Sequence, residues 1–172
     1  MTGHRKNVAG GCKTIPLSQG KCALVDLGDY HRLAKHKWYA AKRRNTWYAV
    51  RNVHRNGKHT LVYMHIYLTG RRGTDHRDGD GLNNQRYNLR SATNRQNTQN
   101  RRGVLGTSSR YKGVHWYKSR CKWAAYITAC GRHISLGYFE REEDAAQAYD
   151  AAALKYFGEF ARPNLGMAKE ET

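Results

Sequence analysis

Acidic residues are scarce in this sequence. Thirteen Asp and Glu stand against 31 Lys and Arg, so the formal charge is +18 at pH 7. No Asp or Glu occurs from residue 81 through 139, a span that carries eleven Lys or Arg. Because so positive a field attracts phosphates at long range, the balance predicts an anionic polymer as partner. The charge alone has an alternative interpretation. It could belong to a basic surface like that of ribosomal proteins, which is merely solvated.

Long hydrophobic runs are also missing. No stretch is long enough to span a bilayer, and the first residues, MTGHRKNVAGGCK, lack the apolar core of a secretory signal. We therefore expect no membrane contact and a cytoplasmic location, where thiols stay reduced. Four cysteines are present, but no two are close enough in the sequence to form the kind of pair that binds a structural zinc ion. We interpret Cys12, Cys22, Cys121 and Cys130 as small buried or incidental residues.

The first half of the chain is rich in β-forming residues. Apolar runs at 14–17 and 22–27 flank Ser18-Gln19-Gly20 and predict a hairpin. A second hairpin is indicated by runs at 47–50 and 61–64 around Asn56-Gly57, since both turn residues tolerate positive φ. Between the hairpins, Asp29 is expected to cap a short helix over 30–36 with Leu33 and Ala34 facing inward.

The segment TDHRDGDGLNNQRYNLRSATNRQN brings together residue types suited to phosphodiester cleavage. Asp75-His76 can end one strand, the loop after it can reverse the chain, and Asn88-Leu89-Arg90 can return as a second strand. Ser91 or Thr93 can then cap a helix that carries Asn97 back over the first strand. In such a ββα hairpin, one carboxylate and one amide oxygen can hold a hard cation such as Mg²⁺. A neutral histidine beside them can accept a proton from water.

A simpler reading of the same residues must be considered. An isolated Asp-His pair says little, and Asp78-Gly79-Asp80-Gly81 is also the composition of a plain turn or of a calcium loop. A calcium loop needs a distal bidentate glutamate, and no acid follows Asp80 for 59 residues. The combined spacing therefore favours a nuclease site.

This pattern resembles the HNH nuclease family, in particular its phage and intron-encoded homing endonucleases. The resemblance covers about residues 62–100. It implies His76 as general base, Asp75 and Asn97 as ligands of Mg²⁺ or another divalent cation such as Mn²⁺, and Asn88 as a brace of the loop. His65 matches an upstream histidine of the family, but Ile66 stands where an arginine often follows. We therefore interpret His65 as structural.

The second half of the chain reads as three short strands and a helix. Strands are expected at 110–117, 122–128 and 133–139, followed by a helix over 142–157 with a face of alanines and Gly158 as its stop. Alternation along the second strand turns Trp123, Ala125 and Ile127 toward the helix. Its other face, with Lys122, Tyr126 and Thr128, is left to meet DNA.

Several motifs here resemble the plant apetala-two/ethylene-response-factor DNA-binding domain. They are Tyr111-Lys112-Gly113-Val114, Trp123-Ala124-Ala125, Leu136-Gly137-x-Phe139 and the alanine-rich helix with the late Gly158, Ala161 and Asn164. The resemblance implies double-stranded DNA as partner. Together with the basic residues nearby, it predicts the following contacts to DNA: Arg101, Arg102, Arg110, Lys112, His115, Tyr117, Lys122, Tyr126, Thr128, His133 and Ser135.

The sequence therefore predicts an α+β protein made of two parts. We expect a mobile arm at 1–12, an HNH ββα-metal nuclease domain with a β-rich N-terminal part at 13–100, a linker at 101–109 and a DNA-binding domain of three antiparallel strands and one helix at 110–166. The predicted activity is site-specific, metal-assisted hydrolysis of DNA by a homing endonuclease in a bacterial host or phage-infected cell, without an organic cofactor. The alternatives are a DNA-binding transcriptional regulator with an inactive HNH fold and an RNA-binding accessory protein.

Overall fold

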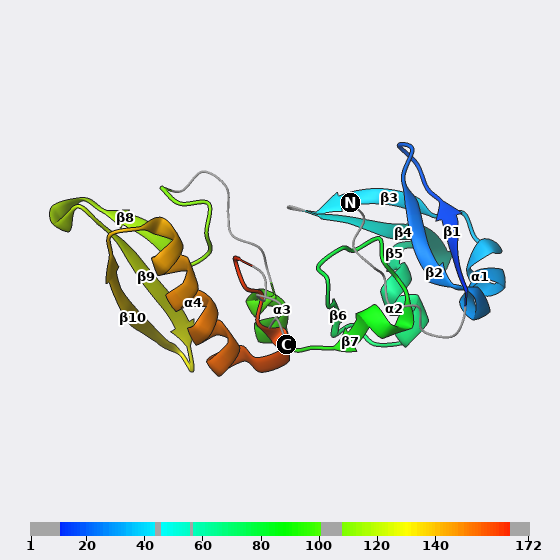
Figure 1. Cartoon of the computed structure of the whole chain (residues 1–172). Coiled ribbons are helices and arrows are strands. Elements are labelled where there is room, and N and C mark those ends of the chain that lie inside the picture. The colour runs from blue at the N-terminus through cyan, green and yellow to red at the C-terminus, as the bar shows by residue number, and fades with distance from the viewer. Residues whose placement is uncertain (1–10, 44–45, 56, 101–107, 166–172) are drawn as a thin grey trace. The chain divides into compact units, whose positions relative to one another are not determined.

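The computed structural model describes residues 11–43, 46–55, 57–100 and 108–165 (Figure 1). The chain divides into two compact units, Met1–Thr93 and Asn94–Thr172, which are described separately below. This division lies before the helix α3, Asn94–Gln99, whereas we expected a domain boundary after residue 100. Within the described residues, no helix is long and apolar enough to cross a membrane.

The first unit begins with the hairpin predicted around Gln19-Gly20. Strand β1, Cys12–Pro16, pairs antiparallel with β2, Cys22–Asp26, and both turn residues have φ near +60°. The mobile arm predicted at 1–12 lies largely outside the described residues, and its last residue, Cys12, already belongs to β1.

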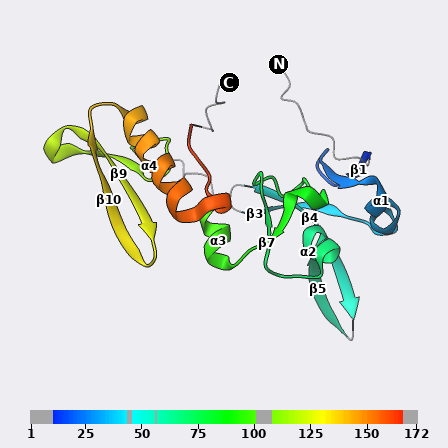
Figure 2. The same ribbon diagram turned by 60° about the horizontal axis from the view of Figure 1, so that its bottom comes forward.

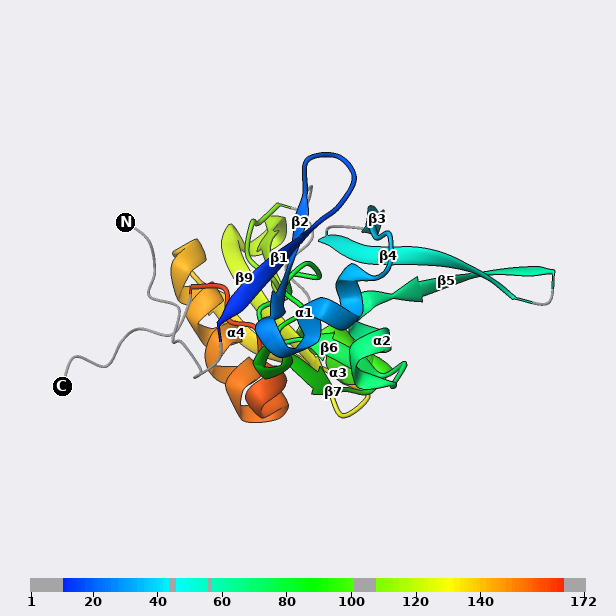
Figure 3. The ribbon, with the colours of Figure 1, turned by 90° about the vertical axis from the view of Figure 1, so that its right-hand side faces the viewer.

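A three-stranded sheet follows, in the order β3-β4-β5. Its strands are β3 (Tyr39–Arg43), β4 (Thr46–Arg55) and β5 (Lys58–Tyr63). The predicted second hairpin is confirmed, with Gly57 at a φ of 73° in the turn; Asn56 lies outside the described residues. Figures 2 and 3 show the β4–β5 end extending away from the rest of this unit. Met64, expected at the end of the second strand, begins helix α2, Met64–Thr69, instead.

The short helix near Asp29 forms, but Asp29 does not cap it. Helix α1 spans Leu27–Ala34, so Asp29 lies inside the first turn. Its buried carboxylate binds the guanidinium of Arg86 at 2.7 and 2.8 Å and that of Arg32 at 3.0 Å. Because the Arg86 hydrogen bond stabilises the ionised form, the pKa of Asp29 is lowered. Leu33 is buried as predicted, whereas Ala34 is exposed.

The core of the first unit lies where the N-terminal hairpin, α1, the three-stranded sheet and α2 meet. Its fully buried side chains come from all of these elements: Ile15, Ala23, Val25, Leu33, Trp38, Ala49, Met64 and Leu68. The indole N–H of Trp38 is satisfied by the carbonyl of Leu33 at 2.9 Å. This core supports the short hairpin of β6, Thr74–His76, and β7, Leu89–Ser91, that carries the predicted cleavage residues.

The second unit contains the predicted sheet and helix. The strands are β8 (Val114–Tyr117), β9 (Lys122–Ala129) and β10 (Arg132–Phe139), antiparallel in the order β10-β9-β8. Helix α4, Glu142–Phe157, runs across one face of the sheet (Figure 1) and ends at Gly158 as predicted. Its alanines pack on Val114, Ala125 and Ile127, so the predicted inward face of β9 is confirmed. The first strand starts later than expected, at Val114, because Gly113 turns the chain with a φ of 75°.

The end of the second unit is fastened to α4 by a buried carboxylate. Asp150 accepts the backbone N–H groups of Asn164 and Leu165 at 2.7 and 2.9 Å. Asn164 in turn accepts the N–H of Lys112 at 2.7 Å and donates to its carbonyl at 3.0 Å. The segment before β8 and the chain after α4 are therefore joined through one asparagine side chain.

The sequence predicts cysteines that are small buried or incidental residues, and the structure excludes the buried alternative. Cys12, Cys22, Cys121 and Cys130 are all exposed and unpaired thiols. In the part of the chain that the structure describes, no group of three or more His, Cys, Asp or Glu side chains is arranged so that it could hold a metal ion.

The close approach of α4 to the sheet makes Gly113 a sensitive position. A methyl group there would come within 2.1 Å of the Tyr149 ring and 2.5 Å of the Tyr126 carbonyl. Gly131 has the same φ of 75° but nothing near its Cβ position, so it is a matched control. We expect Gly113→Ala to cost about 3 kcal/mol, from backbone strain and overpacking together, and Gly131→Ala only about 1 kcal/mol. Urea denaturation checks this, and equal losses would contradict the packing described here.

Candidate active site

The predicted cleavage residues lie on the β6–β7 hairpin. Asp75 pairs with Arg90 and His76 pairs with Leu89 in the antiparallel register. Both expected strands are therefore present, although Asn88 itself ends a short 3-10 turn, Arg86–Asn88, just before β7. Strand β6 thus carries Asp75 and His76, and β7 carries the residues that pair with them in the sheet register.

A buried ion pair fixes the carboxylate of Asp75. Oδ2 of Asp75 accepts hydrogen bonds from Nε and Nη2 of Arg90 at 3.0 and 2.8 Å. The two side chains are only 12% and 6% exposed, so neither charge is well solvated. Removing Arg90 would leave the carboxylate buried without that compensation, which is costly. The cross-strand partner therefore both orients and neutralises Asp75.

His76 is enclosed at the end of β6. Its Nε2 lies 3.4 Å from Oδ1 of the buried Asn84. Burial lowers the pKa of His76, and the Asn84 hydrogen bond and the carboxylates of Asp78, Asp75 and Asp80 offset this only in part. His76 is therefore neutral at pH 7, as a proton acceptor must be.

Two aromatic side chains contact the ring of His76. His65, from α2, makes an edge-on contact with His76 at a centroid distance of 4.9 Å, and Tyr48 from β4 lies 5.9 Å away. Tyr48 and Tyr63 also contact His65. Burial, followed by the proximity of His76, lowers the pKa of His65 to about 3. Nδ1 of His65 is buried and has no hydrogen-bond partner among the described residues.

Asn88 makes hydrogen bonds across the loop that connects the two strands. Its Oδ1 accepts the N–H of Asp78 at 3.1 Å, and its Nδ2 donates to the Asp78 carboxylate and the Asn83 carbonyl at 2.9 and 2.8 Å. Asn88 is 1% exposed, so these bonds are made away from water. A buried amide with this many partners holds the loop in one conformation. The geometry is that of the brace implied by the family resemblance.

The loop is also bound to the N-terminal part of the unit. Leu24 on β2 donates its N–H to Leu82 at 2.9 Å and accepts that of Asn84 at 2.8 Å. Asp26 accepts the N–H of Arg86 at 2.8 Å, next to the Arg86–Asp29 ion pair. The β-rich N-terminal part of the unit therefore packs against the segment that carries the site.

Asn97 lies on α3, in the second unit. Its Oδ1 is buried and, among the described residues, has no hydrogen-bond partner. Asp75 belongs to the first unit and Asn97 to the second, and that the two share one cation stays a prediction. An unpaired buried amide oxygen is nevertheless the kind of group that a cation would satisfy.

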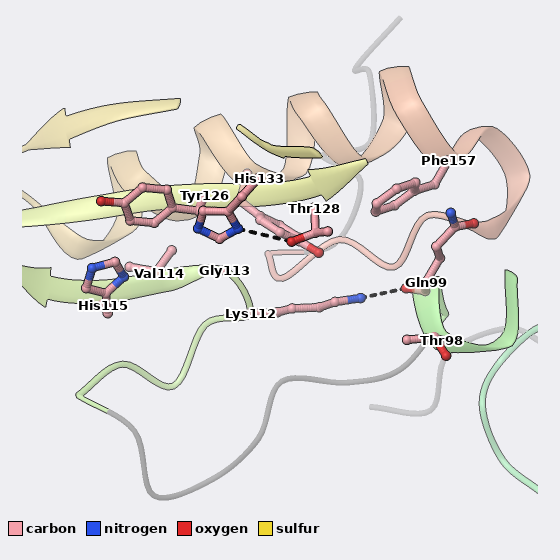
Figure 4. A pocket seen from close by; sticks show the side chains of 11 residues that line it. Thr98, Gln99, Lys112, Gly113, Val114, His115, Tyr126, Thr128, His133 and Phe157 are labelled. Atoms are coloured by element: carbon pink, nitrogen blue, oxygen red, sulfur yellow. Dashed lines mark hydrogen bonds between the residues drawn. The ribbon is translucent and has the colours of Figure 1, made fainter. Parts of the chain in front are cut away.

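The predicted DNA-contacting residues of the sheet form a row of rings on the face opposite α4. His115, Tyr126 and His133 come from the three adjacent strands. Their rings stack with centroid distances of 4.9 Å and interplanar angles of 10° and 18°. Thr128 Oγ1 lies 3.1 Å from Nδ1 of His133 (Figure 4). We call His115, Tyr126 and His133 the ring row.

The other predicted DNA contacts have partners or positions of their own. Tyr117 packs against Tyr138, and Ser135 is exposed on β10. Arg110 lies 3.5 Å from Glu143, and Lys122 lies 2.8 Å from Glu140. These ion pairs are exposed and contribute little to stability, so phosphate can compete for both cations. Arg101 and Arg102 lie outside the described residues.

Sequence reasoning missed the supporting residues of the hairpin. Arg90 was part of the recognised motif but received no role, and Asn84 and Tyr48 were not singled out. The signal for Arg90 was available, because a hairpin in this register places it opposite Asp75. The contacts of Tyr48 depend on tertiary packing and left no local signal.

Comparison with known proteins assigns both halves. The AP2 domain family matches residues 109–159. An uncharacterised HNH endonuclease of Acanthamoeba polyphaga mimivirus, L560, is 34% identical over 151 residues, covering 85% of this chain and 76% of that protein. This chain belongs to the HNH endonucleases and carries a C-terminal AP2 domain. No solved structure matches it.

Two other relatives match shorter stretches of this chain. Protein 3.8 of Escherichia phage T7 is 33% identical over 88 residues, covering 51% of this chain and 72% of that protein. The rice protein APETALA2-like protein 2 is 39% identical over 71 residues, covering 41% of this chain. The chain spans only 16% of the length of the rice protein.

The enclosed histidines should make the first unit sensitive to acid. His65 stays neutral in the folded state down to about pH 3, whereas in the unfolded chain it takes up a proton near its ordinary pKa of 6.5. The buried His65 therefore does not lower the free energy of unfolding above pH 6.5. As the pH falls below that value, it lowers the free energy of unfolding by about 1.4 kcal/mol per pH unit. We expect His65→Gln to flatten the slope of unfolding free energy between pH 4 and 6 by that amount. The exposed His59→Gln is the control, and an identical slope in both variants would contradict the burial of His65.

Proposed function

We propose that this protein is a site-specific, metal-dependent DNA endonuclease of the homing type. The observation that carries the proposal is the braced β6–β7 hairpin, in which Asp75 and His76 are adjacent and held by buried partners. Its substrate is double-stranded DNA, which the AP2 domain binds and the hairpin cleaves. The family relationship supports this reading, since the mimivirus relative is named an HNH endonuclease.

The donor set suits a small divalent cation. Asp75 offers a carboxylate, and Asn97 offers a buried amide oxygen that lacks a partner among the described residues. Mg²⁺ needs few protein oxygens, because substrate phosphate and water complete its coordination. When bound there, the ion would neutralise the charge that develops on the phosphate oxygens during hydrolysis. Arg90 holds Asp75 in place for this purpose.

His76 is proposed to accept the proton of the attacking water. The contact with Asn84 favours the tautomer with hydrogen on Nε2, which makes Nδ1 the basic nitrogen. The lowered pKa of His76 keeps the imidazole neutral before the reaction. Asn84, His65 and Tyr48 surround the ring and limit its rotation.

The AP2 domain is proposed to supply affinity and register. A three-stranded sheet can enter the major groove, and the ring row presents polar ring edges together with nearby cations. Contacts of this kind hold the scissile phosphate near the chemical groups. A DNA-binding regulator with an inactive nuclease fold is the second candidate, because the AP2 domain also occurs in plant proteins named transcription factors.

Cleavage of supercoiled plasmid with Mg²⁺ separates these candidates. We expect the wild-type protein to nick or linearise the plasmid, and His76→Ala to lower the rate at least about a hundredfold, because the general base is lost. Its DNA affinity should stay within about twofold. His59→Ala, on an exposed strand, is the matched control. Tight binding without cleavage under any divalent cation would favour the regulator, and cleavage by His76→Ala at the wild-type rate would exclude His76 as the base.

Substitution of Tyr126, the central ring of the row, tests whether this face of the sheet binds DNA. Tyr126→Ala removes the middle ring of the row, and we expect DNA affinity to fall about tenfold, or about 1.4 kcal/mol. Tyr156→Ala removes an exposed tyrosine from α4 and should leave affinity unchanged. Fluorescence anisotropy with labelled duplex measures both. Equal affinities for the two variants would show that this face does not bind DNA.

A further inference from the structure

Helix α3 is too short to be stable without support. It has six residues, Asn94–Gln99, and each is at least partly exposed, although the Oδ1 atom of Asn97 is buried. Asn and Thr are weak helix formers, and a helix of this length barely pays its nucleation cost in water. The helix that carries Asn97 must therefore be held by contacts to the rest of the chain.

The AP2 domain provides one such contact. Nζ of Lys112 donates a hydrogen bond to the carbonyl of Gln99 at 2.6 Å (Figure 4). The last carbonyls of a helix have no partner inside it and carry partial negative charge. A charge-assisted bond from an ammonium group satisfies one of them and favours the helical end.

Lys112 is itself rigidly held. Both its N–H and its carbonyl bind the side chain of Asn164, and Asn164 is fastened to Asp150 on α4. A continuous series of hydrogen bonds therefore runs from α4 through Asn164 and Lys112 to the end of α3. A flexible surface lysine would give the helix much weaker support.

The same ammonium lies beside the predicted DNA-binding face. Lys112, together with Thr98 and Gln99, lines a cavity of about 530 Å³ that is also lined by the ring row (Figure 4). We propose that Lys112 is a positioning residue that holds α3, and with it Asn97, to the AP2 domain. This proposal rests on the metal-dependent nuclease function proposed above. The AP2 domain then contributes to chemistry as well as to affinity.

Hydrogen exchange of the full-length protein without metal tests the support directly. We expect Lys112→Met to speed exchange of the backbone amides of residues 97–100 at least about tenfold, because the last turn loses its bond to the domain. Lys155→Met, an exposed lysine on α4, removes the same charge and should change nothing. Unchanged exchange in Lys112→Met would overturn the proposal.

Single-turnover cleavage at saturating DNA tests the consequence for chemistry. We expect Lys112→Met to cleave about tenfold more slowly than wild type and to need more Mg²⁺ for half-maximal rate. Lys155→Met should behave as wild type, and Lys112→Arg, which keeps the cation, should recover part of the rate. Faster exchange with a wild-type rate and Mg²⁺ requirement would overturn the positioning role. Faster exchange in a protein whose wild type does not cleave would support the link to α3 and reject the nuclease function.

Discussion

The structure of the β6–β7 hairpin depends on one constraint. Each polar group buried in it needs a hydrogen-bond or ion-pair partner. The loop between β6 and β7 contains six acidic or amide side chains, and one of them, Asn88, which is 1% exposed, makes hydrogen bonds to Asp78 and Asn83. The buried Asp75 carboxylate is likewise matched by the buried Arg90 guanidinium. Since an unpaired buried charge or amide is expensive, this set of bonds permits few alternative conformations. The fixed hairpin holds the side chains of Asp75 and of the neutral His76 each in one orientation.

The rest of the first unit can be understood as support for that hairpin. Strand β2 accepts and donates backbone hydrogen bonds to the loop, and Asp26 and Asp29 hold the turn at Arg86. The N-terminal hairpin and α1 thus connect the loop to the hydrophobic core. Asp26 and Asp29 are two of the few acidic residues in this basic chain. Both bind Arg86 and so hold the loop.

Elements with local signals were predictable from the sequence. Period-two alternation identified β9, the alanine face identified α4, and turn residues identified both early hairpins. Side-chain roles that depend on distant partners were not. Asp29 has the composition of a helix cap, but its carboxylate is bound by Arg86, 57 positions away. Similarly, Lys112 was predicted as a DNA contact by resemblance, and nothing local indicates its bond to Gln99. The ligand role of Asn97 stays a prediction, which rests on the residue pattern and on the family resemblance.

The central claim is that Asp75 and Asn97 bind one divalent ion next to His76. Paramagnetic Mn²⁺ tests it most directly, because the ion broadens the NMR signals of nuclei close to it. Titrated at substoichiometric amounts into the protein bound to duplex DNA, it should broaden the Asn97 side-chain amide and the backbone amides of Asp75 and His76 together. Broadening at Asp75 with a sharp Asn97 signal, or no selective broadening at all, would contradict the account.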